Sequence, residues 1–223
     1  MPFTVSVLSR LLLSTLVTLT SLGLPIAAGS AQQRTDQANL RNTFPGRRVG
    51  GGTRAECASR LLVHLVSPSS TFSPGSSGRL ALLEGPARNP RSVAVIFRDY
   101  RVNGLQPTVG PVIEQQTLPA GEAGIHLFKA PTLSEPVLWE SSFNCQESGD
   151  SGAGLLDFVQ AEAPPALTLL LSDPSGADQS VAEAIAWLSK SCGSTVAVGE
   201  VAARFQLKDI ITSEWPGRLP VRC

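Results

Sequence analysis

Short apolar runs separated by turn-forming residues constrain the fold of this chain more than any other feature of its sequence. Between residues 60 and 163, the turn segments "SSTFSPGSSG" and "PARNP" separate the runs "RLLVHLVSP", "RLALLEG" and "RSVAVIFRDYR". Runs bounded by Gly, Pro, Ser and Asn in this way are typical of β-strands joined by turns. In the third run Val93, Val95 and Phe97 occupy every second position, which predicts a strand with one buried face.

The remaining runs up to residue 163 extend this pattern. "VIEQQTLPAGEAGIHLFKAP" gives two strand candidates around a Pro/Gly turn, and "PVLWESSFNCQ" and "LLDFVQAE" give two more. Trp139 is expected to anchor the core near Cys145. Several short strands at this spacing predict an immunoglobulin-like antiparallel β-sandwich over residues 57–163.

The last part of the chain has a helical pattern instead. "GADQSVAEAIAWLSKSCG" predicts a helix with a capping box of Ser180 and Glu183. Its apolar stripe consists of Val181, Ala184, Ile185 and Leu188, and a second short stripe consists of Val201, Phe205 and Leu207. "PPALTLLLSDP" fits either a strand or a helix start, and "WPGRLPVRC" is expected to be extended with Trp215 partly exposed. Residues 164–223 are therefore predicted to be a small helical segment with a Pro-rich tail, packed on the sandwich of a mainly β, α+β protein.

The N-terminus has the features of an export signal. Arg10 is the only charged residue up to residue 31, and the apolar stretch "LLLSTLVTLTSLGLPI" follows it, then the small residues of "AAGSAQQ". This pattern predicts a signal peptide over residues 1–31, cleaved after Ala31, and a periplasmic or secreted protein. The alternative is an uncleaved membrane anchor, for which the run is short. No later segment is apolar enough to span a bilayer.

Four cysteines follow this signal, Cys57, Cys145, Cys192 and Cys223. An even number of cysteines in an oxidising compartment favours two disulfides, and the sequence leaves three pairings open. No CxxC motif occurs and the two histidines are far apart. We therefore expect no metal site and no cofactor.

Residues 32–56 form a basic leader. The stretch "QQRTDQANLRNTFPGRRVGGGTR" has five Arg and one Asp, with almost no apolar periodicity, so it is expected to be mobile. Its glycines do not match a phosphate-binding loop, because no Lys precedes the Thr and no strand precedes the glycines. A weaker functional interpretation is contact with an anionic envelope polymer or lipid headgroups through Arg47, Arg48 and Arg54.

The stretch "SGDSGAG" around Ser151 resembles the nucleophile loop of chymotrypsin-like proteases, and His64, Asp99 and Ser151 follow the order of that triad. Catalysis would need the Ser151 hydroxyl bonded to a His64 ring whose other nitrogen Asp99 holds. However, His64 lies in the apolar run "LLVHLV", and Ala153 replaces the second glycine after the serine. We interpret the stretch as a turn and expect no catalytic residue.

Several segments, in order, resemble a known family. "GRRVGGGTRAEC", "LVHLVSP", "VLWESSFNC", "SGDSGAGLLDFVQ", "VAEAIAWL" and "FQLKDIITSE" are similar to motifs of exported cyanobacterial proteins in the family called domain of unknown function 928. The usual Gly-Trp is absent from the returning strand and Cys192 and Cys223 look like additions, so the chain resembles a divergent member. The resemblance implies export to the cell envelope, a Cys57–Cys145 bridge and with it a Cys192–Cys223 bridge. It implies no activity.

These observations predict a non-catalytic binding or assembly module of the cell envelope. Disulfides, strands and the lack of a convergent polar constellation favour it. The expected partner is an envelope protein or a polysaccharide, and no nucleic acid is expected. Two alternatives stay open: a hydrolase, either serine-type through Ser151 or carboxylate-based, and a sensory partner domain for another envelope protein.

Overall fold

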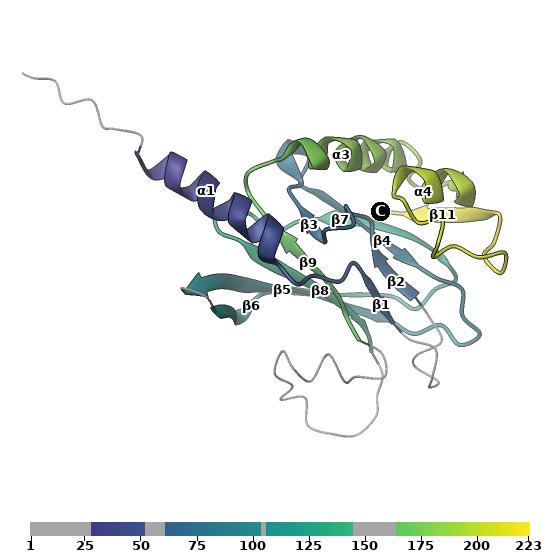
Figure 1. The fold of residues 1–223 in the computed structure, drawn as a ribbon. Coiled ribbons are helices and arrows are strands. Elements are labelled where there is room, and N and C mark those ends of the chain that lie inside the picture. Colours follow the sequence, from purple (N-terminus) through teal and green to yellow (C-terminus); the bar gives the residue numbers. More distant parts are fainter. Residues whose placement is uncertain (1–27, 52–60, 104–105, 145–163) are drawn as a thin grey trace, which may run out of the picture.

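Two β-sheets face each other across one core in the computed structural model, which describes residues 28–51, 61–103, 106–144 and 164–223 (Figure 1). The first sheet contains, in spatial order, β1 (Val49–Gly51), β2 (Leu61–His64), β4 (Arg79–Glu84), β7 (Gly124–Lys129), β11 (Arg218–Arg222) and β10 (Thr195–Ala197). The second contains β3 (Thr71–Phe72), β9 (Ala166–Leu170), β8 (Val137–Phe143), β5 (Val93–Asn103) and β6 (Gln106–Leu118). The helices of the described ranges are α1 (Ala28–Thr43), α3 (Gly176–Ser189) and α4 (Val198–Arg204), with a short 3-10 turn, η1 (Gly75–Ser77). Within these ranges no helix combines the length and the apolar character needed to cross a bilayer.

The β-sandwich with a small helical part is confirmed, with one correction to its topology. Most neighbouring strands are antiparallel, but β3 pairs with β9 and β11 pairs with β7 in parallel. Both sheets of the sandwich are therefore mixed, with one parallel pair in each among antiparallel neighbours. Parallel neighbours need a long connection, and here the chain passes from β7 through β8 and β9 of the second sheet and then through α3, β10 and α4 before it forms β11.

The core lies between the sheets and is built from the inward-facing residues of both. Val93, Val95 and Phe97 are fully buried, which confirms the strand predicted from their alternation. Trp139 is also fully buried and is confirmed as a core anchor. Its ring meets that of Phe128 edge to face, with 5.6 Å between centroids. Burial of an indole removes roughly 200 Å² of surface from water, so β8 is held firmly in the middle of its sheet.

The C-terminal part contributes strands as well as helices, which corrects the prediction of a helical segment over residues 164–223. β9 is inserted between β3 and β8, and β10 and β11 complete the first sheet. The Pro-rich tail is β11, in which Leu219 and Val221 are buried and Val221 pairs with Ile125 of β7. This alternation is a strand signal, and the prolines of the segment concealed it.

Helix α3 carries the predicted apolar stripe but begins earlier than the predicted capping box. The stripe residues are all buried: Val181, Ala184, Ile185 and Leu188. The Asp178 carboxylate accepts hydrogen bonds from the Ser175 amide and hydroxyl at 2.6 and 2.9 Å, which fixes the helix start at Ser175. The capping box of Ser180 and Glu183 is therefore wrong.

The segment around α4 confirms the second stripe. Its three residues, Val201, Phe205 and Leu207, are buried. Trp215 is only 7% exposed, so the prediction that it is partly exposed is wrong. Trp187 of α3 is half-buried, and the Arg204 guanidinium lies 4.6 Å from its ring centroid.

The leader predicted to be mobile over residues 32–56 contains helix α1 and strand β1 where the structure describes it. Leu40 and Phe44 pack on the outer face of the second sheet, against Tyr100 and Leu138. The Phe44 and Tyr100 rings meet edge to face at 5.5 Å. Two apolar residues are too few to give a periodic pattern, but they cover an apolar strip that the sheet itself supplies.

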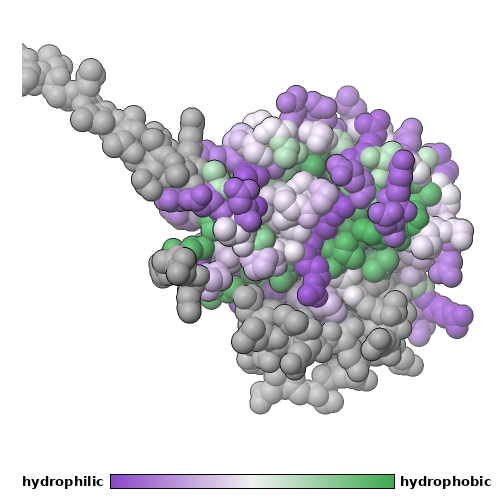
Figure 2. Space-filling model, viewed as in Figure 1, coloured by the Kyte–Doolittle hydropathy of each residue, from purple (hydrophilic) through white to green (hydrophobic). Residues whose placement is uncertain are grey.

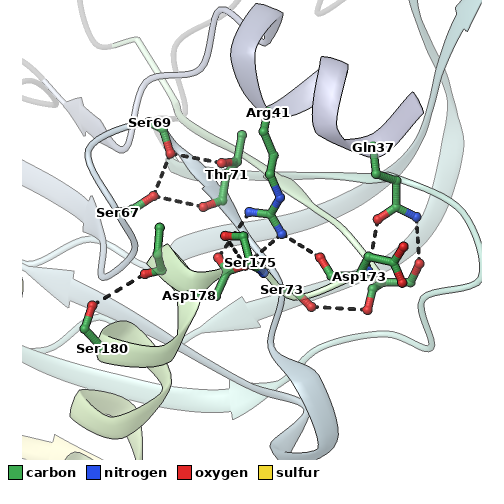
Figure 3. Close-up of polar contacts among 12 residues, drawn as sticks. Gln37, Arg41, Ser67, Ser69, Thr71, Ser73, Asp173, Ser175, Asp178 and Ser180 are labelled. Carbon is green, nitrogen blue, oxygen red and sulfur yellow. Dashed lines mark hydrogen bonds and ion pairs between the residues drawn. The ribbon is translucent and has the colours of Figure 1, made fainter. Parts of the chain in front are cut away.

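Polar contacts complete this attachment (Figure 3). Arg41 Nη2 lies 2.7 Å from Asp178 Oδ2 and donates to the Asp173 carbonyl at 2.6 Å. The Gln37 amide donates to Ser172 Oγ and accepts from the Asp173 backbone N–H, at 2.8 and 3.0 Å. Both side chains reach from α1 to the segment between β9 and α3, so they attach the leader to the start of α3.

Two glycines of the "GGG" run have structural reasons. A Cβ atom at Gly50 would collide with the backbone of Pro165 and Ala166. Gly51 has a φ of 83°, a conformation that favours glycine, and its amide donates to the Pro164 carbonyl at 2.8 Å. These glycines let β1 approach the start of β9 closely.

Candidate functional site

His64 of β2 is a fully buried histidine between the two sheets. Its ring stacks on Trp139 of β8, with centroids 3.5 Å apart and planes 9° apart, and Nδ1 lies 2.7 Å from the Thr168 hydroxyl of β9. Within the described part of the chain Nε2 has no hydrogen-bond partner. Burial lowers the pKa of His64 well below its usual 6.5, so the ring is neutral at physiological pH.

The surroundings of His64 differ from those of a catalytic histidine. Asp99, its predicted triad partner, lies on β5 with its carboxylate 2.7 Å from Arg101, whereas His64 Nδ1 is bonded to Thr168. The His64–Asp99 contact that a serine hydrolase needs is therefore not formed. Ser151 and the "SGDSGAG" stretch lie outside the described residues.

A second polar cluster joins three strands of the first sheet. His126 Nε2 of β7 lies 3.2 Å from Glu84 Oε2 of β4 and 3.3 Å from Arg222 Nη1 of β11. The guanidinium also donates to the Glu122 carbonyl at 3.1 Å, and a side chain at Gly124 would collide with it. Glu84 is fully buried, and the His126 ring links its carboxylate to the Arg222 guanidinium. The cluster holds the C-terminal strand in the sheet.

Another buried carboxylate, Glu140, lies on the outer face of the second sheet. Burial raises the pKa of Glu140, and Arg98, whose Nε lies 3.5 Å from Glu140 Oε2, opposes that shift. A carboxylate-based hydrolase needs a second carboxylate across an open cleft, but the charged neighbour given by the structure is a cation. In the described ranges, no group of three His, Cys, Asp or Glu side chains is placed to hold a metal ion.

The arginines predicted to contact an anionic polymer have different surroundings. Arg47 is exposed, and its backbone bridges to Leu167. Arg48 donates to the Val66, Phe205 and Gln206 carbonyls at 2.8 to 2.9 Å, and burial lowers its pKa. Arg54 lies outside the described residues. Anion contact by these arginines stays a prediction.

One of the two disulfides is present in the described part of the chain. Cys192, in the turn after α3, is bonded to Cys223 at the end of β11, which confirms this pairing. Cys57 and Cys145 lie outside the described residues, so their bridge stays a prediction.

Two surface pockets, of about 310 and 420 Å³, offer little chemistry. The smaller has no ionisable side chain among its described lining residues: Ser73, Pro74, Gly75, Gly78, Ala130, Pro131, Thr132, Leu133, Leu171 and Ser172. The larger is bordered by Gln37 and Arg41, whose polar groups already bind the turn before α3. Neither combines an apolar enclosure with convergent free polar groups, as a small-molecule site does.

The β5–β6 hairpin is the most exposed apolar part of the described surface. In Figure 1 it projects beyond the rest of the sandwich, and Figure 2 shows apolar surface where it emerges. The large hydrophobic side chains that are exposed among the described residues, Val102, Val112 and Ile113, at 42, 44 and 49%, all lie on this hairpin. Such clustering is typical of an interaction surface, since scattered single residues carry no such meaning.

Strand β6 is also an edge strand, with β5 as its neighbour among the described strands. The Tyr100 amide of β5 donates to the Pro136 carbonyl beside β8, so even-numbered residues of β5 bond towards β8. The bonding side alternates along a strand, and odd-numbered residues of β5 therefore bond to β6, at even-numbered positions such as Glu114. Gln115 and Thr117 then direct their amide and carbonyl groups outwards. We call residues 113–117 with these groups the β6 edge.

Two prolines in the sequence favour an edge position for this strand. "VIEQQTLP" was predicted to be a strand, but its place in the sheet was not. Pro111 precedes the edge and Pro119 follows it, and prolines are more frequent in edge strands, at strand starts and at bulges than inside central strands. A register shift at Phe97 and Arg98 further marks a bulge of the kind found at sheet edges.

Comparisons with protein-family models, with curated proteins and with solved structures each found no match for this chain. The resemblance to the domain of unknown function 928 family stays a prediction.

Proposed function

We propose that this chain is an exported, non-catalytic binding or assembly module that contacts a protein of the cell envelope through the β6 edge. The observation that carries the proposal is the coincidence, on one hairpin, of outward-directed backbone groups and exposed apolar side chains. A sheet edge binds another strand through main-chain hydrogen bonds, and the adjacent side chains give specificity.

The buried polar side chains have contacts that support a structural role. The β6 edge is therefore the stronger candidate for the functional site. His64 and Glu84 are fully buried, and Glu140 is 6% exposed and faces Arg98. Each joins neighbouring strands of the sandwich. Catalysis by these three side chains would require a substrate to reach side chains that are buried in the folded chain.

A protein partner is favoured over a polysaccharide. Sugar rings are held by exposed aromatic faces and hydrogen-bonding groups, but Trp139 and Trp215 are buried and Trp187 lies under the Arg204 guanidinium. Export is supported by the Cys192–Cys223 bridge, because disulfides persist in oxidising compartments.

The proposal is tested with the purified full chain, immobilised and exposed to envelope extract of the cells that produce it. We expect the double variant Val112→Lys, Ile113→Lys to retain at least about tenfold less of the specifically bound protein, because two charges at the edge prevent strand addition. The matched control is Thr212→Lys, Ser213→Lys, which adds the same charge to an exposed loop elsewhere. Equal retention by all three proteins would contradict the proposal.

A further inference from the structure

We infer that Arg79, Lys129 and Lys190 bind phosphate groups of a polyanion, and we call these three residues the basic cluster. They come from the start of β4, the end of β7 and the C-terminal end of α3. All three are exposed, so a ligand reaches them without any rearrangement of the core. The cluster belongs to the first sheet and the β6 edge to the second. The inference therefore goes beyond the proposed function and does not depend on it.

Two of the cations face each other directly across neighbouring strands. Arg79 of β4 is the Cα partner of Lys129 of β7 in their antiparallel register. Side chains at directly opposite positions lie on the same face of a sheet, with Cβ atoms about 5 Å apart, and like charges placed in this way repel each other. The pair therefore lowers the stability of the chain alone, and an anion bound between the two side chains removes the repulsion.

Two contacts bring the third cation to the same place. Arg79 Nη1 donates to Ser189 Oγ at 3.5 Å, so the guanidinium reaches the last residue of α3, which Lys190 directly follows. Cys192, two residues further on, is tied by its disulfide to the end of β11, and β11 is the neighbour of β7. The hydrogen bond and the disulfide thus hold Lys190 beside the Arg79–Lys129 pair.

The basic cluster is not neutralised by the part of the chain that the structure describes. None of its three side chains is in an ion pair with a carboxylate of the described ranges. The C-terminus of α3 has a partial negative charge of roughly half a unit, which favours Lys190 there but does not balance three cations. The formal net charge of the chain is 0 at pH 7, so a polyanion is attracted by a local cluster and not by the overall charge.

A phosphate group matches these three side chains chemically. Its oxygens accept charge-assisted hydrogen bonds from several donors at once. The Arg79 guanidinium can donate to two oxygens side by side, whereas each lysine ammonium acts as a compact point charge. Lipid headgroups and soluble polyphosphates share this chemistry, and the experiments below distinguish the two sources.

The first test compares two variants of the purified full chain that have the same change of charge. Arg79→Glu alters the basic cluster, whereas Arg88→Glu alters an exposed turn beyond the other end of β4. We expect Arg79→Glu to bind polyphosphate at least about fivefold more weakly than the wild type, the effect of one basic residue at an anionic surface. Arg88→Glu should bind as the wild type does in the same calorimetric titration. Equal weakening in both variants would show attraction to total charge alone and would overturn the site.

Urea unfolding separates a loss of binding from a loss of folding. Without polyphosphate, we expect Arg79→Glu to unfold at a higher urea concentration than the wild type, because the new carboxylate faces Lys129 and attraction replaces repulsion. Polyphosphate should raise the midpoint of the wild type and leave that of Arg79→Glu unchanged, since a ligand stabilises the state that it binds. A lower midpoint for Arg79→Glu without polyphosphate would contradict the repulsion on which the inference rests.

Vesicles identify the source of the phosphate. The full chain is sedimented with vesicles of phosphatidylcholine and phosphatidylglycerol, and vesicles of phosphatidylcholine alone are the control. Binding to the mixed vesicles that Arg79→Glu weakens assigns the site to lipid headgroups, whereas binding to polyphosphate alone assigns it to a soluble phosphate polymer. A wild-type chain that binds neither overturns the inference and leaves the proposed function of the β6 edge standing.

Discussion

His64 is neutral in the folded chain because burial removes its ring from water, which disfavours the charged form. The stacked Trp139 ring and the Thr168 hydroxyl are uncharged, and the ring is fully buried. A protonated imidazole would need a second acceptor at Nε2, which has no partner within the described structure. The histidine therefore stabilises the sandwich only while it stays neutral.

This burial predicts a loss of stability in mild acid. The unfolded chain protonates His64 near pH 6.5, whereas the folded chain does so only well below that value, since burial lowers the pKa. Below pH 6.5 the unfolded state binds more protons, so the free energy of unfolding falls as pH falls, by at most about 1.4 kcal/mol per pH unit. Above pH 6.5 the imidazole does not change how the free energy of unfolding depends on pH. Urea unfolding between pH 5 and pH 8 measures the effect.

A double variant isolates the contribution of the imidazole. His64→Phe with Thr168→Val keeps a ring on Trp139 and replaces both hydrogen-bonding partners by apolar groups of similar shape. Glu140 contributes to the pH dependence of stability with the opposite sign, because its raised pKa increases the free energy of unfolding as pH falls. The contribution of Glu140 is the same in wild type and variant, so it cancels when the pH slopes of their free energies of unfolding are subtracted. An equal slope for the two proteins below pH 6.5 would contradict the role of His64.

Helices and strands were predictable where apolar residues recur with a period of 3.6 or of two residues. The strand containing Val93 and the stripe of α3 followed directly from their spacing. The tail that forms β11 was expected to be extended, but its pairing in a sheet was not predicted because prolines mark turns more often than strands. The early start of α3 was missed because Ser175–Asp178 and Ser180–Glu183 both fit the capping pattern in sequence, and the structure forms the first of them.

The candidate site was less predictable than the fold. Exposure of Val112 and Ile113 depends on which strands flank β6, and one sequence without pairing information does not determine that. The apolar run around His64 predicts a strand, which the structure has as β2, but the stacking of His64 on Trp139 joins residues far apart in the chain. Contacts of this kind follow from sheet packing and not from local pattern.

The attachment of α1 is tested at the element scale with Arg41→Ala. The Asp178 side chain is 3% exposed and loses its cation, so we expect the free energy of unfolding to fall by about 1–3 kcal/mol. Hydrogen exchange at the Phe44 amide, which donates to the Leu40 carbonyl, should accelerate as α1 detaches. Arg47→Ala is the control and should change stability by no more than about 0.5 kcal/mol. Unchanged exchange at Phe44 would show that apolar contacts alone hold the helix.

At the scale of the whole molecule, the chain is closed by its last strand. β11 lies between β7 and β10, so the first sheet is complete only when the C-terminus is in place. Three kinds of contact hold it there: the strand ladders, the Arg222–His126–Glu84 cluster, and the Cys192–Cys223 bond. The bond spans a sequence separation of 31, so it restricts a sizeable loop of the unfolded chain.

We expect removal of the Cys192–Cys223 bond to lower the stability of the whole chain. Cys192→Ser with Cys223→Ser should lower the free energy of unfolding by about 3–4 kcal/mol, as expected for closing a loop of this length. Both cysteines are exposed, so the change leaves no cavity, and the effect should come mainly from the freer unfolded chain. Urea unfolding measures the loss, and Ser194→Ala, a nearby exposed substitution, should change stability by no more than about 0.5 kcal/mol. In the double variant, hydrogen exchange at the Val221 amide, which donates to the Ser194 carbonyl, should occur through global unfolding. If the double variant is as stable as the wild type, the ladders and the Arg222 cluster alone hold the C-terminal strand.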